Sequence, residues 1–256
     1  MITIKNSFAQ EKMAIAGSLL AQLFEKLYTF VQPGMTTHAV DAFIENYLTA
    51  HKLKSSSKGY LGYKHVSCIS VNDEVVHGVP RETTVLALGD LIKIDICASY
   101  DGYCADMARS FVLGAVDKAV ADFIQTGQSA LDKGIAAAQE GARLSDISAA
   151  VQQEVESHGY GVVREFAGHG IGKKMHEDPE ILNYGKRGCG PVIRAGMAFA
   201  IEPMITMGDY KIFLLPDGWT AKTVDKSLAV HVEDTIIITN NGPVIITRLQ
   251  AEELRG

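Results

Sequence analysis

The sequence predicts an α+β fold in which two similar halves, at about residues 1–115 and 116–256, make one domain. Three observations support this prediction. A pattern of two helices followed by strands occurs twice, and antiparallel hairpin signals stand beside the helices. Acidic residues and a histidine also interrupt strand-like or glycine-rich segments in both halves. The third observation indicates that the two halves meet at a shared site.

The first half begins with apolar side chains at helical spacing over about residues 7–31, and this pattern stops at Gln32-Pro33-Gly34. Thr37 is the expected N-cap of a second helix. A loop rich in Ser, Gly, Lys and Tyr follows at residues 55–63. The strands expected in this half cover residues 66–71, 75–79 and 91–97.

The second half repeats this plan about 107 residues later. Asp117 is the expected cap of a long helix that runs to about Gln139. In the next helix, Ile147 takes the place that Val40 holds in the first copy, and this helix ends at Gly159. The strands expected here cover residues 161–166, 197–206, 228–239 and 243–247.

Composition excludes several classes of protein. The net charge of -6 and the pI near 5.7 argue against a nucleic-acid or anionic-membrane surface. The first ten residues do not have the pattern of a signal peptide, and no run approaches the roughly 18 apolar residues that a membrane span needs. A cytoplasmic protein is therefore expected. Its cysteines form no CxxC pair and are expected as reduced, buried thiols at Cys68, Cys97, Cys104 and Cys189.

The first acidic pair lies on a predicted hairpin. A two-residue turn at Asp101-Gly102 pairs residues whose numbers add to 203, which sets Cys97 opposite Asp106 and Asp95 opposite Ala108. Asp95 and Asp106 then share one face as diagonal neighbours, roughly 7 Å apart at the backbone. The alternative is a pair of solvated carboxylates. Asp95 argues against it, because it interrupts an apolar run and a lone buried carboxylate is costly.

The second half supplies further polar residues in unusual places. Glycines flank His169, and His176 follows seven residues later. Glu202 shares a strand face with two alanines, which leaves room for an ion, and Glu233 shares a face with His231. Taken singly, each of these is more often a structural or exposed residue. Four carboxylates and one imidazole together form a ligand set that can hold two divalent ions, because carboxylates can bridge.

Five segments, in order along nearly the whole chain, resemble type 1 methionine aminopeptidases. They are Asn72-Asp73-Glu74-Val75-Val76-His77-Gly78-Val79-Pro80, Lys93-Ile94-Asp95-Ile96 with Asp106, Gly168-His169-Gly170-Ile171-Gly172, Phe199-Ala200-Ile201-Glu202-Pro203-Met204 and Val232-Glu233-Asp234-Thr235. The short interval from Glu202 to Glu233 matches type 1, because type 2 enzymes carry a helical insertion there.

The resemblance implies the pita-bread fold, with two pseudo-symmetric αβ halves around a dinuclear site, and two divalent ions drawn from Co, Mn, Fe(II) or Zn. The implied metal ligands are Asp95, Asp106, His169, Glu202 and Glu233, with Asp106 and Glu233 bridging. The implied catalytic residues are His77, His176 and Glu202. The implied methionine pocket consists of Tyr60, Tyr63, Cys68, Met175 and Trp219 together with His77 and His176.

The hypothesis is removal of an N-terminal methionine that precedes a small residue. Glu202 would take a proton from a water that bridges the metals, and His176 would help to stabilise the oxyanion. His77 would hydrogen-bond the amide nitrogen after the scissile bond. The implied partners are N-termini of nascent polypeptides or peptides, with transient ribosome association, a monomeric enzyme and neither nucleic acid nor membrane.

Two departures from the family pattern stand near the site. Cys104-Ala105-Asp106-Met107 replaces a His-Gly-Asp-Thr/Ser block, which changes the surroundings of one ligand, and Met175 replaces an aromatic residue. Two alternatives also stay open. One is a proline-specific peptidase or creatine amidinohydrolase of the same fold, although those relatives usually carry an additional N-terminal domain. The other is a metal-free module that binds RNA or ribosomal partners, which would require lost ligands and a basic patch.

Overall fold

The structure of the chain is a computed structural model that describes residues 1–249. It contains the helices α1 (Ser7–Phe30), α2 (Thr37–Ala50), α3 (Lys118–Ala137) and α4 (Ser145–Ser157) and the 3-10 helix η1 (Tyr60–Gly62). The strands of the first half are β1 (Lys54–Ser55), β2 (Cys68–Val71), β3 (Glu74–Val76), β4 (Leu91–Tyr100) and β5 (Tyr103–Val112). Those of the second half are β6 (Gly161–Val162), β7 (Ala167–Gly170), β8 (Glu177–Leu182), β9 (Ala198–Ile201), β10 (Met204–Thr206), β11 (Ile212–Leu214), β12 (Ala221–Thr223), β13 (Ala229–His231), β14 (Glu233–Thr239) and β15 (Gly242–Ile245).

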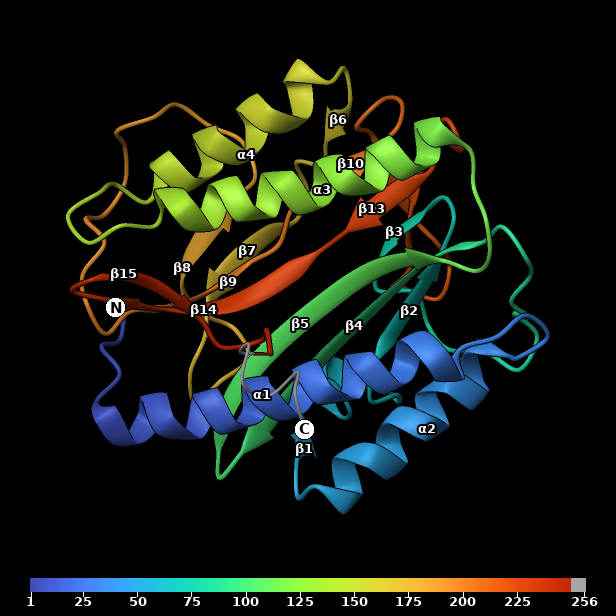
Figure 1. The fold of residues 1–256 in the computed structure, drawn as a ribbon, viewed down its shortest axis with the longest axis horizontal. Coiled ribbons are helices and arrows are strands. Elements are labelled where there is room, and N and C mark those ends of the chain that lie inside the picture. Colours follow the sequence, from blue (N-terminus) through green and yellow to red (C-terminus); the bar gives the residue numbers. More distant parts are fainter. Residues whose placement is uncertain (250–256) are drawn as a thin grey trace.

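The predicted α+β class is confirmed, with a large sheet and two pairs of helices. In the view of Figure 1, α1 and α2 lie below the strands and α3 and α4 lie above them. The nine-stranded sheet runs in the order β1-β4-β5-β14-β9-β7-β8, with β2 added to β4 and β15 added to β14. Its two halves join where β5 pairs antiparallel with β14, through Ala108 opposite Glu233 and Met107 opposite Asp234. Polar residues at this junction therefore come from both halves.

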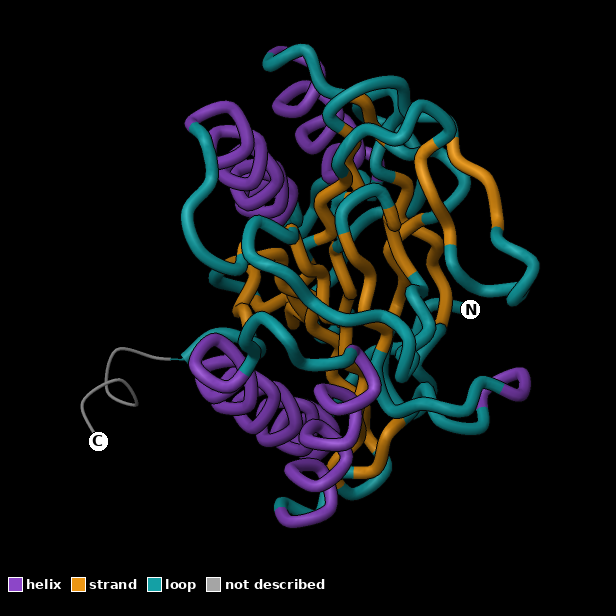
Figure 2. The backbone as a smooth tube through the Cα atoms, turned by 90° about the vertical axis from the view of Figure 1, so that its right-hand side faces the viewer, coloured by secondary structure: helices purple, strands orange, loops and turns teal. Residues whose placement is uncertain are grey.

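Each helix pair buries its own apolar cluster against the sheet. From α1, Met13, Leu20 and Leu27 are fully buried against β4 and β5, and each such side chain stabilises the fold by about 1.5–3 kcal/mol. From α3, Phe123 and Leu131 pack into a second cluster with residues of β9 and β14. In Figure 2, α1 and α3 lie on the same side of the strands, and the loop that carries η1 extends on the other side.

Helix capping confirms one prediction and corrects another. Asp117 caps α3, since its Oδ1 accepts a hydrogen bond from the backbone N–H of Val120 at 3.0 Å. The expected cap at Thr37 is wrong, because Thr36 caps α2 by accepting from the N–H of Ala39. The hydroxyl of Thr37 is engaged elsewhere, where it accepts from the N–H of Arg81 at 2.9 Å. Because Thr36 and Thr37 are adjacent and either residue type can cap a helix, the sequence alone does not show which of them is the N-cap.

The hairpin register is confirmed, with Cys97 opposite Asp106 and Asp95 opposite Ala108. The predicted long strands 197–206 and 228–239 are wrong, because each divides between two sheets. The divisions fall at Pro203, which has no N–H to donate, and at Val232, whose N–H donates to the Pro203 carbonyl. The strand predicted at residues 161–166 is shorter in the structure, where β6 covers Gly161–Val162 and β7 follows at Ala167–Gly170. The sequence did not predict β8, β11 or β12.

The cysteines are free thiols, as predicted, but the predicted burial is confirmed for only two of these four. Cys97 and Cys104 are buried and Cys68 is half-buried, whereas Cys189 is exposed. The Ser145 hydroxyl donates to the Cys189 carbonyl and accepts from the Cys189 N–H, which holds the backbone of Cys189 while its side chain is exposed. Within residues 1–249, none of the helices combines the length and the apolar character that a membrane crossing requires.

Candidate metal centre and substrate pocket

All of the predicted site residues line one cavity of about 240 Å³. The predicted ligands in its wall are Asp95, Asp106, His169, Glu202 and Glu233. The other predicted residues in its wall are Tyr60, Tyr63, Cys68, His77, Met175, His176 and Trp219. The fold thus brings together side chains that lie as far apart in the chain as Tyr60 and Glu233. Their roles as ligands, catalytic groups or pocket walls stay predictions.

The large sheet sets two carboxylates in one row. Asp95 on β4 and Glu233 on β14 both pair with Ala108 on β5, one from each side. Because residues that pair across adjacent strands point to the same face, the two carboxylates flank a single methyl group. The small side chain of Ala108 leaves the space between them open.

A second row carries two more of the predicted ligands, Asp106 and His169. Asp106 is fixed to β14, because its N–H donates to Thr235 Oγ1 at 2.8 Å and the Thr235 hydroxyl donates to the Asp106 carbonyl. Thr235 pairs with Ala200, which in turn pairs with His169. Gly168 allows this close approach, since a Cβ at that position would lie 2.4 Å from the Ala200 carbonyl oxygen. Glycine beside the histidine is therefore a packing requirement.

The side chains of His169, Asp106 and Glu202 lie close together. His169 Nε2 is 3.9 Å from Asp106 Oδ2 and 3.5 Å from Glu202 Oε1. His169 Nδ1 lies 3.0 Å from the Gly170 carbonyl oxygen, which accepts a hydrogen bond from the Nδ1–H group, so that Nε2 keeps a free lone pair. A histidine held in this tautomer is arranged as metal-binding histidines are.

The electrostatics of the cavity disfavour negative charge in the absence of cations. Burial and repulsion from Asp106 raise the pKa of Asp95, and burial and repulsion from Glu202 raise the pKa of Asp106 to about 7. Burial raises the pKa of Glu202 to about 8. Burial, followed by repulsion from Asp106, raises the pKa of Glu233. A nearby positive charge would lower the pKa of each of these carboxyl groups and stabilise its ionised form.

The donor set fits divalent metal ions. Within residues 1–249, no Lys or Arg forms an ion pair with any of the four carboxylates. Glu233 Oε1 is buried and has no hydrogen-bond partner among the described atoms. Ligand atoms of Asp106, His169 and Glu233 all lie within 4.8 Å of one another. Buried, unpaired carboxylate oxygens beside an imidazole are the chemistry that a divalent cation satisfies.

His231 belongs to the site, although its sequence context gave it no role beyond sharing a face with Glu233. Its Nε2 is 3.3 Å from Glu202 Oε2 and 4.0 Å from Glu233 Oε2 and has no hydrogen-bond partner among the described atoms. Burial lowers the pKa of His231 to about 4, so the ring is neutral. The signal in the sequence was a histidine two residues before a candidate ligand, at the end of a strand.

Aromatic rings form the outer wall of the cavity. Tyr63 packs edge-on against Trp219 with ring centroids 4.9 Å apart, and Tyr63 is itself held by a 2.9 Å hydrogen bond from its hydroxyl to the Ser67 carbonyl. On the opposite side, Tyr60 Oη lies 3.2 Å from His176 Nδ1. Phe166, which the sequence reading missed, lies edge-on to His77 at 5.0 Å. These contacts shape an apolar wall around a polar floor.

His77 adopts an unusual backbone conformation. Its φ is +58°, in the left-handed region that non-glycine residues rarely adopt. Gly78 follows it, and a Cβ there would lie 2.3 Å from the Ile69 carbonyl oxygen, so the backbone passes directly against β2. Burial lowers the pKa of His77 to about 4, and repulsion from His231 and His176 adds to that shift. A strained, neutral histidine in a cavity wall is a feature typical of functional sites.

Comparison with known proteins agrees with this geometry. The model of a protein family described as "Metallopeptidase family M24" matches residues 11–240. A methionine aminopeptidase of Clostridium acetobutylicum is 43% identical over 247 residues, which is 96% of this chain and 99% of that protein. The methionine aminopeptidase of Escherichia coli is 38% identical over 247 residues, which is 96% of this chain and 94% of that protein.

Solved structures show the same fold. The crystal structure of a methionine aminopeptidase from Thermotoga maritima superimposes with a TM-score of 0.95 at 40% identity, over 97% of this chain and 100% of that chain. A prolidase from Pyrococcus furiosus gives a TM-score of 0.77 at 23% identity, over 96% of this chain and 66% of that chain. At that identity the prolidase shows the fold alone. The chain therefore has the pita-bread fold that the sequence predicted.

Proposed function

The chain belongs to metallopeptidase family M24, and we propose that it removes the N-terminal methionine from nascent proteins and peptides, through a water held between two divalent ions. It is a metal-dependent hydrolase, by family and by its likeness to methionine aminopeptidases. The observation that carries the finer proposal is the group of four carboxylates, two of them buried and two half-buried, that share a single cavity with one imidazole. Two ions would be held by Asp95, Asp106, His169, Glu202 and Glu233.

Bound divalent ions lower the pKa of a shared water and polarise the peptide carbonyl. Glu202 would accept the proton of the attacking water, and its pKa near 8 in the ion-free cavity marks it as a group that readily holds a proton. His176 would donate to the oxyanion from Nε2, with the Tyr60 hydroxyl donating to its Nδ1. His77, neutral and half-buried, would bind the amide nitrogen after the scissile bond.

The aromatic wall supports the choice of substrate. Tyr60, Tyr63, Cys68, Met175 and Trp219 would enclose the flexible, polarisable side chain of methionine. The preference for a small second residue and transient ribosome association are carried over from the resemblance, as are a monomeric enzyme and a cytoplasmic location.

The proposal is tested by elemental analysis of the purified protein together with hydrolysis of a Met-Ala-Ser peptide. We expect two equivalents of a divalent metal and release of free methionine. A parallel assay with Xaa-Pro peptides separates this activity from that of a proline-specific peptidase. Cleavage of Xaa-Pro in preference to Met-Ala, or a protein that retains no divalent metal, would overturn the assignment.

A further inference from the structure

We propose that His38, Asp41 and His65 form a second metal site, outside the substrate cavity, that takes a single zinc ion or a similar borderline divalent ion. The three residues offer two imidazole nitrogens and one carboxylate oxygen, and these atoms all lie within 4.8 Å of one another. None of the three lines the substrate cavity. This inference does not depend on the proposed peptidase activity.

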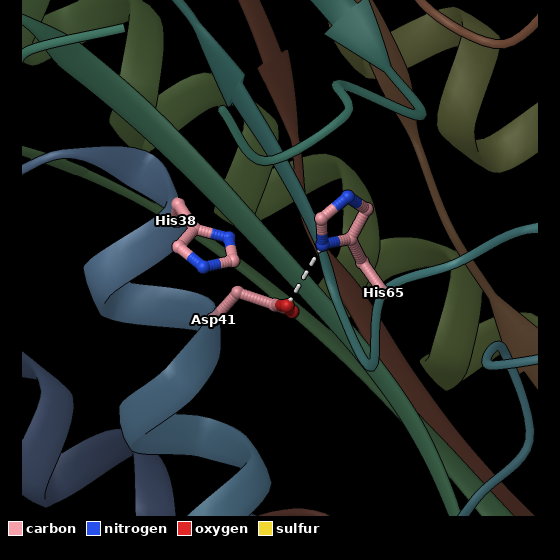
Figure 3. Close-up of side chains that lie close together, drawn as sticks. All are labelled: His38, Asp41 and His65. Carbon is pink, nitrogen blue, oxygen red and sulfur yellow. Dashed lines mark hydrogen bonds and ion pairs between the residues drawn. The ribbon is translucent and has the colours of Figure 1, made fainter. Parts of the chain in front are cut away.

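The backbone sets two of these ligands in advance. His38 and Asp41 stand in the first turns of α2, three residues apart, so that their side chains leave the helix on neighbouring positions of one face. His65 comes from the loop that leads into β2. Figure 3 shows the His38 and His65 rings on either side of the Asp41 carboxylate. The two rings are nearly perpendicular, with centroids 5.9 Å apart.

Asp41 is held rigidly in the position of a ligand. Its Oδ1 accepts from the N–H of Val66 at 3.1 Å, from the N–H of Ser67 at 3.0 Å and from the Ser67 hydroxyl at 2.7 Å. These three donors leave Oδ2, which lies 3.0 Å from His65 Nδ1, and an ion bound here would replace the proton of that contact, which leaves to solvent. The carboxylate is 6% exposed, and so it cannot easily turn toward water instead.

His38 has the partner that metal-binding histidines commonly have. Its Nε2 lies 3.4 Å from Glu82 Oε1, so that this carboxylate can accept the Nε2 proton and leave the Nδ1 lone pair for a metal. Metal bonds of about 2.0–2.2 Å require ligand atoms no more than about 4.4 Å apart, so a small rotation of one ring closes the site. The His38 side chain is 45% exposed, which leaves it free to rotate and gives an ion access.

The donor chemistry selects the ion. Two imidazoles and one carboxylate suit zinc, cobalt or nickel, whereas manganese and magnesium prefer all-oxygen sites. Zinc with three protein ligands leaves its fourth position to water. An ion here would also fix the loop between Tyr63 and Cys68, two residues that line the substrate cavity. The site would thus stabilise one wall of the cavity from behind.

The test is a zinc titration followed by calorimetry, with elemental analysis after gel filtration. We expect three equivalents of zinc in the unchanged protein and two in His38→Gln and His65→Gln. His38→Gln leaves the Asp41–His65 contact intact, so it stays informative if His65→Gln fails to fold. His158→Gln is the matched control, since His158 is exposed and lies on α4's C-terminal end, and it should keep three equivalents.

A spectroscopic arm locates the ion. Addition of the third equivalent should shift the ring ¹⁵N resonances of His38 and His65 and leave that of His158 unchanged. Equal zinc stoichiometry in the unchanged protein and in His38→Gln would overturn the proposal and leave Asp41 as an anchor for the loop alone. Loss of the other two equivalents would bear on the dinuclear centre and would leave this inference standing.

Discussion

His231 Nε2 lies 3.3 Å from Glu202 Oε2, at the point where two strands leave the large sheet together. Glu202 directly follows β9 of the large sheet, and His231 is the last residue of β13. In the smaller sheet, His231 pairs with Met204 of β10. The contact therefore depends on the shared division at Pro203 and Val232. It sets a neutral imidazole against a predicted metal ligand.

Replacement of His231 is expected to weaken metal binding. His231→Leu removes a nitrogen that can bind an ion or hold Glu202 in place, and the expected loss of manganese or cobalt affinity is about 10–100-fold. His231→Gln keeps a side-chain donor and should recover part of the affinity. Calorimetric titration of the metal-free protein measures both, with His158→Leu as the control. Unchanged affinity in His231→Leu would show that His231 only fills space.

Glu202→Gln is expected to keep the fold and lose most turnover. The amide has nearly the shape of the carboxylate but cannot accept the proton of the attacking water. The loss expected for a missing general base is about 10²–10⁴-fold in kcat on Met-Ala-Ser. Far-UV circular dichroism should match that of the unchanged protein. A variant that cleaves the peptide at the normal rate would disprove the role given to Glu202.

Metal removal is expected to change how stability depends on pH. In the ion-free protein the pKa of Asp106 is raised from 3.8 to about 7 and that of Glu202 from 4.5 to about 8. A raised folded-state pKa means that the folded protein binds protons more tightly than the unfolded chain does. These groups therefore contribute stability that is fully present below about pH 4 and is lost as the pH rises through about 7 to 8.

The measurement is the free energy of unfolding in urea at pH 5 and pH 8, with and without a chelator. The chelated protein should lose more stability between these two values than the metal-loaded protein, because bound cations keep the carboxylates ionised at both. Groups remote from the cavity contribute equally to the two samples and cancel in the difference. Equal changes in the two samples would contradict the prediction.

A buried ion pair behind the site should matter to stability on its own. Asp234 is fully buried and accepts from Arg109 at 2.6 Å, from Thr247 at 2.8 Å and from Arg248 at 2.7 Å. Arg109→Met leaves that charge short of one partner and is expected to cost about 3–5 kcal/mol of unfolding free energy. Lys118→Met is the control, because the Lys118–Asp122 pair is exposed and should change stability by less than about 1 kcal/mol.

Unfolding of the chelated proteins in urea separates this effect from metal binding. A loss below 1 kcal/mol in Arg109→Met would mean that Arg248 alone neutralises Asp234.

The sequence predicted what local patterns determine. The turn at Asp101-Gly102 fixed the register of β4 and β5, and therefore the shared face of Asp95 and Asp106. The helices were predictable because the spacing of apolar residues and the helix-ending pair Pro33-Gly34 are local signals that extend over only a few residues. The cap at Thr37 was wrong because a tertiary contact with Arg81 decided between two neighbouring threonines.

The parts that escaped prediction depend on contacts between distant segments. Division of the long strands at Pro203 and Val232 follows from a hydrogen bond between two segments that the sequence does not place side by side. His231 was left without a role for the same reason, since its neighbour Glu202 reaches it only after that division. Phe166 carries no local signal and acquires its place through His77.

The junction between β5 and β14 has a mechanical consequence. Its register joins only two residue pairs, Ala108 with Glu233 and Met107 with Asp234. Two of the five predicted ligands come from one side of this narrow junction and three from the other, so captured cations would act as cross-links between the halves. Chelation should then let the halves separate more often, and backbone amides of β5 and β14 should exchange with heavy water before those of α1 or α3.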